Sequence, residues 1–190
     1  HRGSSAASDV YKRQSLSYAE NISFYIPVGH KNIKSLNKDF VVKKLKPILE
    51  DPSIKKVGQN IKYDFIILKK YGVELNSVED TMLLSYTLDA GNNRHNMDTL
   101  SELHLNHKTI SYKDLVGSGK KQLKFSEVDI DKATEYAAED ADVTLRLYEI
   151  LSERVSDEKL SQIYEAFEKP MIKILSKLET YGIKVDDNYL

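Results

Sequence analysis

The chain of 190 residues contains no cysteine and no tryptophan. Without cysteine, disulfides, thiolate catalysis and cysteine-ligated zinc are excluded. No apolar run reaches membrane-spanning length, and the first residues lack the apolar core of a signal peptide. The lack of cysteine is compatible with a reducing compartment but does not by itself identify one. We expect no membrane partner.

An excess of charge of one sign is also missing. The formal net charge is −1 and the sequence pI is near 6.6. No overall positive field would attract nucleic acid, so phosphate binding must rest on local basic residues or on bound cations. What is present is a hydrophobic share of 41%. That share can build the core of one domain, with a short piece of another.

The order of the hydrophobic periods predicts an α/β fold with a small sheet. Alternation over 15–28 predicts a hairpin that turns at Glu20 and Asn21. The stretch "IKKVGQN" (54–60) predicts a strand, after which Asn60 is expected to cap a helix over 61–72. "IKVDD" predicts a last strand near the end of the chain. Further helices are expected over 38–50, 80–90, 97–105, 129–155 and 158–181, and a basic loop over 117–124.

One carboxylate stands on a helix face that should be buried. In "YAAEDADVTLRLYEIL" (136–151), Asp140 shares a face with small and apolar residues, namely Ala133, Ala137, Thr144, Leu147 and Leu151. Asp142 is expected to point elsewhere, where it can be solvated. Buried aspartate is rare unless it is paired or holds a metal. Asp140 is therefore either a core carboxylate with a local hydrogen bond or a metal ligand.

A second carboxylate, Asp64 in "GQNIKYDFIIL" (58–68), lies at the edge of a buried face just after a predicted strand. In α/β folds this is where ligand sites occur, although a first-turn aspartate can also simply complement the helix dipole. If Asp64 and Asp140 converge, their charges repel unless a cation lies between them. Tyr136, one turn before Asp140, either points its hydroxyl into that pocket or lies at the edge of the core.

Taken together, these segments resemble a known family. "VGQNIKYDFIILKKYGVEL" resembles the second exonuclease motif, Asn-x2-Tyr-Asp, of bacterial DNA polymerase I (family A). "YAAEDADVTLRLY" resembles the third motif, Tyr-x3-Asp. The sequence between these two motifs resembles the same domain. "FEKPMIKILSKLETYGIKVDDNYL" resembles the segment that leads into the polymerase domain. The resemblance covers residues 15–190.

The resemblance implies a ribonuclease H-like fold, in which helices flank a small mixed sheet. It implies a monomeric, cytoplasmic bacterial protein that proofreads DNA by hydrolysing the 3′-terminal phosphodiester. It further implies two divalent metal ions, Mg²⁺ or, as alternatives, Mn²⁺ or Zn²⁺. Asp140 would ligate the first metal, Asp64 would serve the second largely through water, and Tyr136 would orient the attacking water.

The resemblance also implies contacts with the single-stranded 3′ end of DNA. The residues concerned are Gln59, Asn60, Tyr63, Arg94 and Phe125. Tyr63 could stack on a base. For Phe125, packing down on the domain is an equally good interpretation. For the lysines of the basic loop (Lys120, Lys121 and Lys124), a solvated charge run is the commoner outcome.

One departure from the family is plain, because its first motif, Asp-x-Glu on the opening strand, does not occur before Asp64. We therefore expect residues 1–14 to be a disordered, non-native leader. Residues 15–156 would form an incomplete exonuclease domain, and 157–190 would begin the polymerase domain. Such a fragment is expected to have an unfilled strand position and to be inactive.

Two other functions stay open. One is a non-catalytic scaffold or single-strand-binding module, against which the retention of Asp64, Tyr136 and Asp140 argues. The other is a related 3′–5′ exoribonuclease. The polymerase-like segment from Phe167 argues against that alternative.

Overall fold

The computed structural model describes residues 13–31, 33–119, 122–182 and 184. Residues 1–12 of the expected leader lie outside this part, as do Lys120, Lys121 and nearly all of the strand expected at "IKVDD". The first strand begins at Arg13, two residues before the expected start of the domain. Among the described residues, no helix is both long and apolar enough to cross a membrane.

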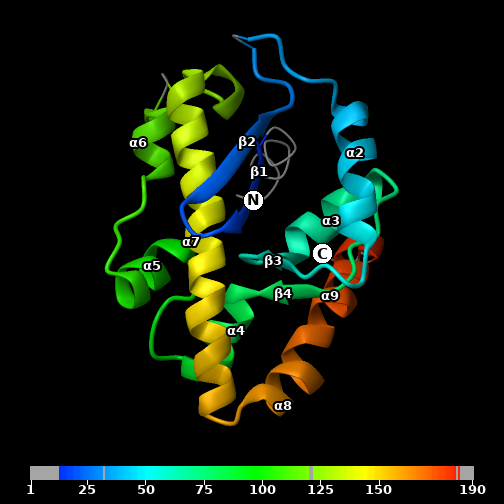
Figure 1. The fold of residues 1–190 in the computed structure, drawn as a ribbon, viewed down its shortest axis with the longest axis vertical. Helices are drawn as coiled ribbons and strands as arrows, with labels where there is room; N and C mark the ends of the chain where they lie inside the picture. The colour runs from blue at the N-terminus through cyan, green and yellow to red at the C-terminus, as the bar shows by residue number, and fades with distance from the viewer. Residues whose placement is uncertain (1–12, 32, 120–121, 183, 185–190) are drawn as a thin grey trace.

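The strands of the described residues form two separate pairs (Figure 1). β1 (Arg13–Ala19) and β2 (Ile22–Pro27) make the predicted antiparallel hairpin, while β3 (Lys56–Gly58) and β4 (Val78–Asp80) run parallel. β4 was not predicted, and its last residue, Asp80, was expected to begin the helix over 80–90. The described strands are thus both antiparallel and parallel, as expected for this fold, and no described strand bridges the two pairs.

The long helix α7 (Ile130–Asp157) runs through the molecule and contacts the hairpin, β3 and three other helices (Figure 1). Asp129 caps it, accepting hydrogen bonds from the backbone N–H groups of Asp131 and Lys132 at 3.1 and 3.3 Å. Its buried face carries mainly small and apolar side chains at helical spacing, as predicted: Ala133, Tyr136, Ala137, Val143, Leu147, Leu151 and Val155. Burial of this stripe fixes the helix against the rest of the fold.

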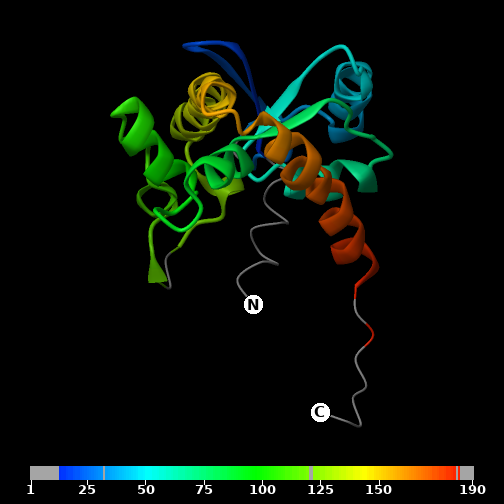
Figure 2. The same cartoon turned by 90° about the horizontal axis from the view of Figure 1, so that it is seen from below.

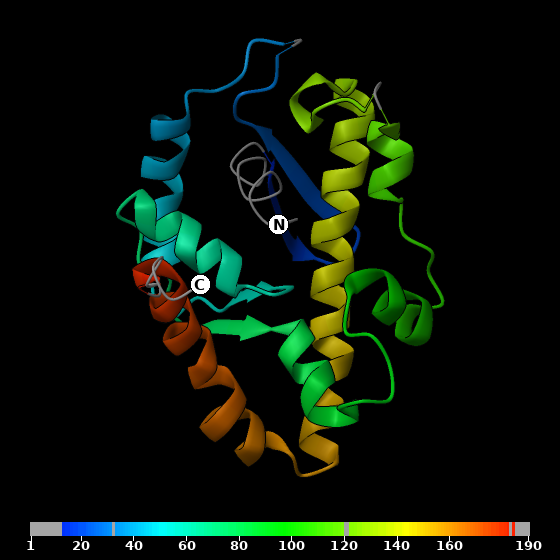
Figure 3. The ribbon, with the colours of Figure 1, turned by 180° about the vertical axis from the view of Figure 1, so that it is seen from behind.

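The other helices surround these elements (Figures 2 and 3). They are α2 (Lys38–Glu50), α3 (Lys62–Lys70), α4 (Thr81–Asp89), α5 (Met97–Leu105), α6 (Tyr112–Val116), α8 (Ser161–Ile163) and α9 (Lys169–Tyr181). The single helix expected over 158–181 is interrupted by a π-helical segment, Tyr164–Glu168. Pro170 lies two residues after this segment and has no N–H for an α-helical hydrogen bond, which favours an irregularity in the preceding turn.

Helices α3 and α9 pack against each other (Figure 3). At one end Lys62 of α3 forms an ion pair with Glu179 of α9. Between the helices lies a hydrophobic cluster that contains Ile61, Phe65 and Ile172. This packing holds the first turn of α3, and so Asp64, in a fixed place in the fold.

Candidate active site

Asp64 lies in the first turn of α3 and is half-buried. Burial, with the nearby charge of Asp80 as the second cause, raises the pKa of the Asp64 carboxyl to about 6. The two carboxylates thus lie close together at the start of α3. A carboxyl with a pKa near neutrality is typical of functional sites, where burial and like charges are tolerated.

Asp80, at the end of β4, fixes the backbone that leads into α3. It is 1% exposed. Its oxygens accept hydrogen bonds from the backbone N–H groups of Asn60, Ile61 and Met82, each at 2.9 Å. Asp80 therefore caps α4 and at the same time ties down the loop before Asp64. Asp80 was not among the predicted site residues, although an aspartate directly before a helix is an N-cap signal.

The predicted role of Asn60 as the cap of α3 was wrong. Ile61 occupies the position before the helix, and Asn60 adopts a left-handed conformation with φ of 55°. The physical reason is that Asp80 already accepts the N–H groups at this helix entry. The turn is tight as well, since a Cβ on Gly58 would lie 2.8 Å from the side chain of Ile61. Glycine at position 58 lets the chain pass from β3 into α3.

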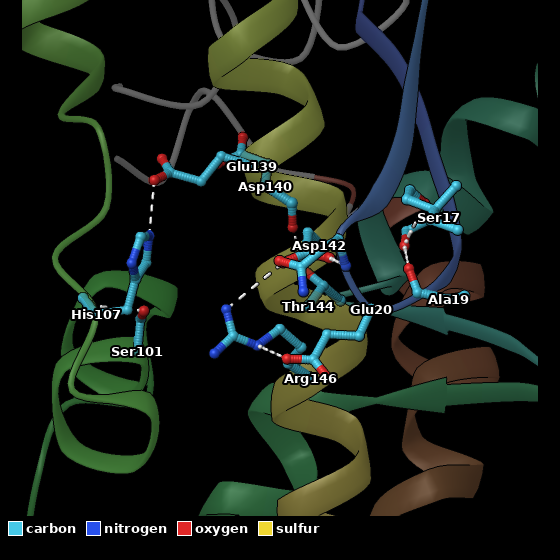
Figure 4. Close-up of polar contacts among 12 residues, drawn as sticks. Ser17, Ala19, Glu20, Ser101, His107, Glu139, Asp140, Asp142, Thr144 and Arg146 are labelled. Carbon is cyan, nitrogen blue, oxygen red and sulfur yellow. Dashed lines mark hydrogen bonds and ion pairs between the residues drawn. The ribbon is translucent and has the colours of Figure 1, made fainter.

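Asp140 lies on α7 between two carboxylates that anchor the helix on different sides (Figure 4). Glu139 contacts Nε2 of His107 at 2.8 Å and accepts the N–H of Ile110 at 2.7 Å. Asp142 accepts the N–H of Asn21, in the hairpin turn, at 2.5 Å. These contacts set the rotation of α7 about its axis and thereby the direction of Asp140, whose Oδ1 is buried.

The prediction that Asp142 is solvated was wrong. Its side chain is only 14% exposed, and its second oxygen lies 3.6 Å from Arg146. Arg146 also reaches Glu20 in the hairpin turn, at 3.4 Å (Figure 4). The helical period places Asp142 away from the buried face of α7. The hairpin, which is distant in the sequence, nevertheless packs over this part of α7 and covers Asp142.

The aromatic residues proposed near the site lie mainly in the core. Phe125 is 0% exposed and contacts the rings of Tyr25 and Tyr136, with centroids 6.1 and 6.2 Å apart. The prediction that Phe125 contacts DNA was therefore wrong, because the loop packs its ring into the domain. Tyr136 is buried beside it, at 8% exposure.

Of the other residues expected to contact DNA, Tyr63 and Arg94 are accessible. Tyr63 is 45% exposed, and Nζ of Lys62 lies 5.5 Å from its ring centroid. Arg94 is exposed. Gln59 is engaged within the fold, since its side-chain N–H donates to the carbonyl of His95 at 2.8 Å and its oxygen accepts from Thr81. It positions the loop that carries Arg94.

The described residues contain no group of three or more histidine, cysteine or acidic side chains close enough to hold a metal ion together. The predicted convergence of Asp64 and Asp140 stays a prediction. It is favoured by the contact between β3 and α7, because α3 follows directly after β3. The two aspartates offer the hard oxygen ligands that a divalent cation needs, but not a complete set.

The raised pKa of Asp64 predicts a pH-dependent effect of Asp64→Asn on stability. The folded-state pKa of Asp64 is above its ordinary value of 3.8. The contribution of Asp64 to the free energy of unfolding is therefore complete below pH 3.8 and is lost as the pH rises through about 6. At about pH 8 we expect the free energy of unfolding of the Asp64→Asn variant to be about 1–2 kcal/mol higher than that of the unsubstituted chain. At about pH 3.5 we expect the two free energies to be equal.

The measurement is urea unfolding across this pH range, with Asp39→Asn, at an exposed position on α2, as the matched control. An Asp64→Asn difference that does not change with pH would show that the carboxylate is not desolvated in the folded chain.

The chain is similar to proteins of known families. The model of a 3′–5′ exonuclease family matches residues 13–156. The chain is 47% identical over 177 residues to DNA polymerase I of Rhizobium leguminosarum, covering 87% of this chain and 17% of that protein. It is 40% identical over 183 residues to DNA polymerase I of Pseudomonas aeruginosa, covering 93% of this chain and 20% of that protein. The chain thus spans at most a fifth of the length of these relatives.

Solved structures show the same fold. Brucella melitensis NrnC is similar with a TM-score of 0.68 and 21% identity, over 94% of this chain and 80% of that one. The polymerase domain of Pol1 from M. smegmatis, in complex with DNA primer-template and dNTP, is similar with a TM-score of 0.70 and 20% identity. That match covers 92% of this chain and 26% of the other.

Proposed function

Since the chain belongs to the 3′–5′ exonuclease family of DNA polymerase I, we propose that it is a domain that removes nucleotides one at a time from the 3′ end of single-stranded DNA, and that this chain, which has no Asp-x-Glu before Asp64, does so far more slowly than a domain with that motif. The observation that carries the proposal is the hydrogen-bonded loop that leads into α3. There the half-buried Asp64 is held in place by a fully buried Asp80, at the motif where the family has its second acidic residue. In a polymerase this activity serves proofreading.

We propose that Asp64 and Asp140 bind two divalent metal ions, with Mg²⁺ the natural choice for carboxylate ligands. NrnC, which shares the fold, has been solved with bound Mg²⁺. When bound, such ions lower the pKa of a water and stabilise the leaving oxygen of a phosphodiester. A cation beside Asp64 would also offset its repulsion from Asp80, because it adds positive charge between two acidic groups.

The residues of the chain would then bind and orient the strand. The exposed ring of Tyr63, beside Asp64, can stack on the terminal base. The exposed guanidinium of Arg94 can pair with a phosphate, and Gln59 holds the loop that carries it. Tyr136 would help to position the attacking water from the edge of the core. DNA is favoured over RNA because the relatives at 47% and 40% identity are DNA polymerases.

The test uses a single-stranded DNA labelled at its 5′ end, with the protein in excess so that slow hydrolysis is visible. We expect a ladder that shortens from the 3′ end one nucleotide at a time and that EDTA prevents. Asp64→Ala and Asp140→Ala should each abolish the ladder, and the double variant should be no worse than either, because residues that act as one unit are not additive.

RNA of the same sequence is the substrate control and should be degraded more slowly. Internal cuts, loss from the 5′ end, or an unchanged rate for Asp140→Ala would each contradict the proposal.

A further inference from the structure

A buried polar network joins the end of β4 to the π-helical segment that follows α8. Tyr164, the first residue of that segment, is 3% exposed and packs in a hydrophobic cluster with residues of α4 and α7. Its hydroxyl donates to Oε2 of Glu79 at 2.9 Å and accepts the N–H of Asp80 at 3.1 Å. One hydroxyl group thus bonds to the last two residues of β4.

Lys169, at the start of α9, completes the network. Its Nζ lies 2.8 Å from Oε1 of Glu79 and 2.9 Å from Glu165. A buried carboxylate is costly unless it is paired and hydrogen-bonded, and Glu79 is only 8% exposed. Each oxygen of Glu79 has a partner from the C-terminal segment, namely Tyr164 or Lys169. The end of β4 and this segment therefore hold each other in place.

The network reaches Asp64 through Asp80. Tyr164 fixes the N–H of Asp80, while the carboxylate of Asp80 accepts the N–H of Ile61 at 2.9 Å. Asp64 follows three residues later, in the first turn of α3. The continuation of the segment contacts the same turn, because Ile172 of α9 shares a hydrophobic cluster with Ile61. The C-terminal segment thus supports the entry to α3 by a polar and by an apolar contact.

We propose that Tyr164 is a positioning residue of the candidate active site, because it fixes Asp80 and thereby the loop that places Asp64. The inference rests on the proposed action on DNA. The family model matches only as far as residue 156, and the sequence alone suggested that the residues after it begin a polymerase domain. The inference instead makes 161–181 part of the exonuclease unit.

The test compares two variants that each lose one tyrosine hydroxyl. Tyr164→Phe keeps the ring in the core and removes the two hydrogen bonds to Glu79 and Asp80. The control, Tyr71→Phe, removes a hydroxyl that accepts from the exposed Lys38 at 3.1 Å, beyond the other end of α3. Circular dichroism should show that both variants are folded.

The first measurement is amide hydrogen exchange, followed by NMR in the absence of metal ions. In Tyr164→Phe we expect the N–H groups of Ile61 and Asp80 to exchange at least about tenfold faster than in the control, because local opening no longer breaks the buried hydrogen bonds of the hydroxyl. The N–H of Ala137, on the buried face of α7, is the internal reference and should exchange at the same rate in both variants.

The second measurement is the DNA ladder of the proposed activity, with the protein in excess. We expect the maximal rate of Tyr164→Phe to be at least about tenfold below that of the control, since small displacements of a reacting group cost much rate. The protein concentration that gives half the maximal rate should change less than about threefold, because Tyr63 and Arg94, which are proposed to bind the strand, are unaltered.

Equal exchange of Ile61 in the two variants would overturn the proposal. Faster exchange that includes Ala137 to the same extent would overturn it too, because Tyr164 would then contribute only to overall stability. Equal maximal rates would also contradict it. Absence of a ladder from the unsubstituted chain would count against the proposed function instead, and the exchange of Ile61 would still decide whether Tyr164 holds the loop.

Discussion

Adding an N-terminal strand that carries Asp-x-Glu is expected to raise the rate of 3′-end hydrolysis at least about a hundredfold, because small misplacements in such sites cost that much. The chain has no Asp-x-Glu before Asp64. A cation held by Asp140 without those two carboxylates would be weakly bound and poorly positioned. Positioning is most of what a two-metal site contributes.

The added strand is expected to join the two strand pairs. The described strands form two unconnected pairs, and a strand between them would pair with both and complete one mixed sheet. Its backbone groups would find partners, and its carboxylates would face the region of Asp64 and Asp140. We therefore expect a gain in stability together with the gain in rate.

The measurement is the initial rate of nucleotide release from a 3′-labelled oligonucleotide with Mg²⁺. The matched control is the same strand with Asn-x-Gln, which should restore stability but not rate. Asp140→Ala in the extended chain should abolish the gained activity. If the chain without the strand is as fast as the extended one, the metal-site interpretation of Asp140 is wrong.

Asp80→Ala is expected to lower the free energy of unfolding by about 3 kcal/mol. The substitution removes the acceptor of three backbone N–H groups at the entries to α3 and α4. Each orphaned buried group costs about 1–3 kcal/mol. The loss is partly offset because burial already disfavours the charged carboxylate, as its raised pKa shows.

Urea unfolding curves, fitted with a common m value, would measure this change in the free energy of unfolding. Asp80→Asn keeps one acceptor oxygen and should lie between Asp80→Ala and the unsubstituted chain. Asp39→Ala, at an exposed position, is the control and should change the free energy by less than about 0.5 kcal/mol. An Asp80→Ala effect no larger than this control would show that the entry to α3 does not depend on Asp80.

The sequence by itself determined the features that depend on near neighbours in the chain. Alternation predicted the hairpin, and the spacing of small and apolar residues predicted the buried face of α7. The motifs around Asp64 and Asp140 were sufficient to identify the family, because they combine residue type, order and spacing. Each of these signals lies within a short window of sequence.

Only the tertiary structure decided the contacts between distant segments. The N–H of Asn21 meets Asp142, 121 residues away, which is why that carboxylate is covered. Asp80 reaches Ile61 across 19 residues and replaces the cap that Asn60 was expected to provide. Phe125 is in the core because the hairpin and α7 enclose it. No local period encodes such contacts, because hydrogen bonding and burial depend on which segments the packed fold brings together.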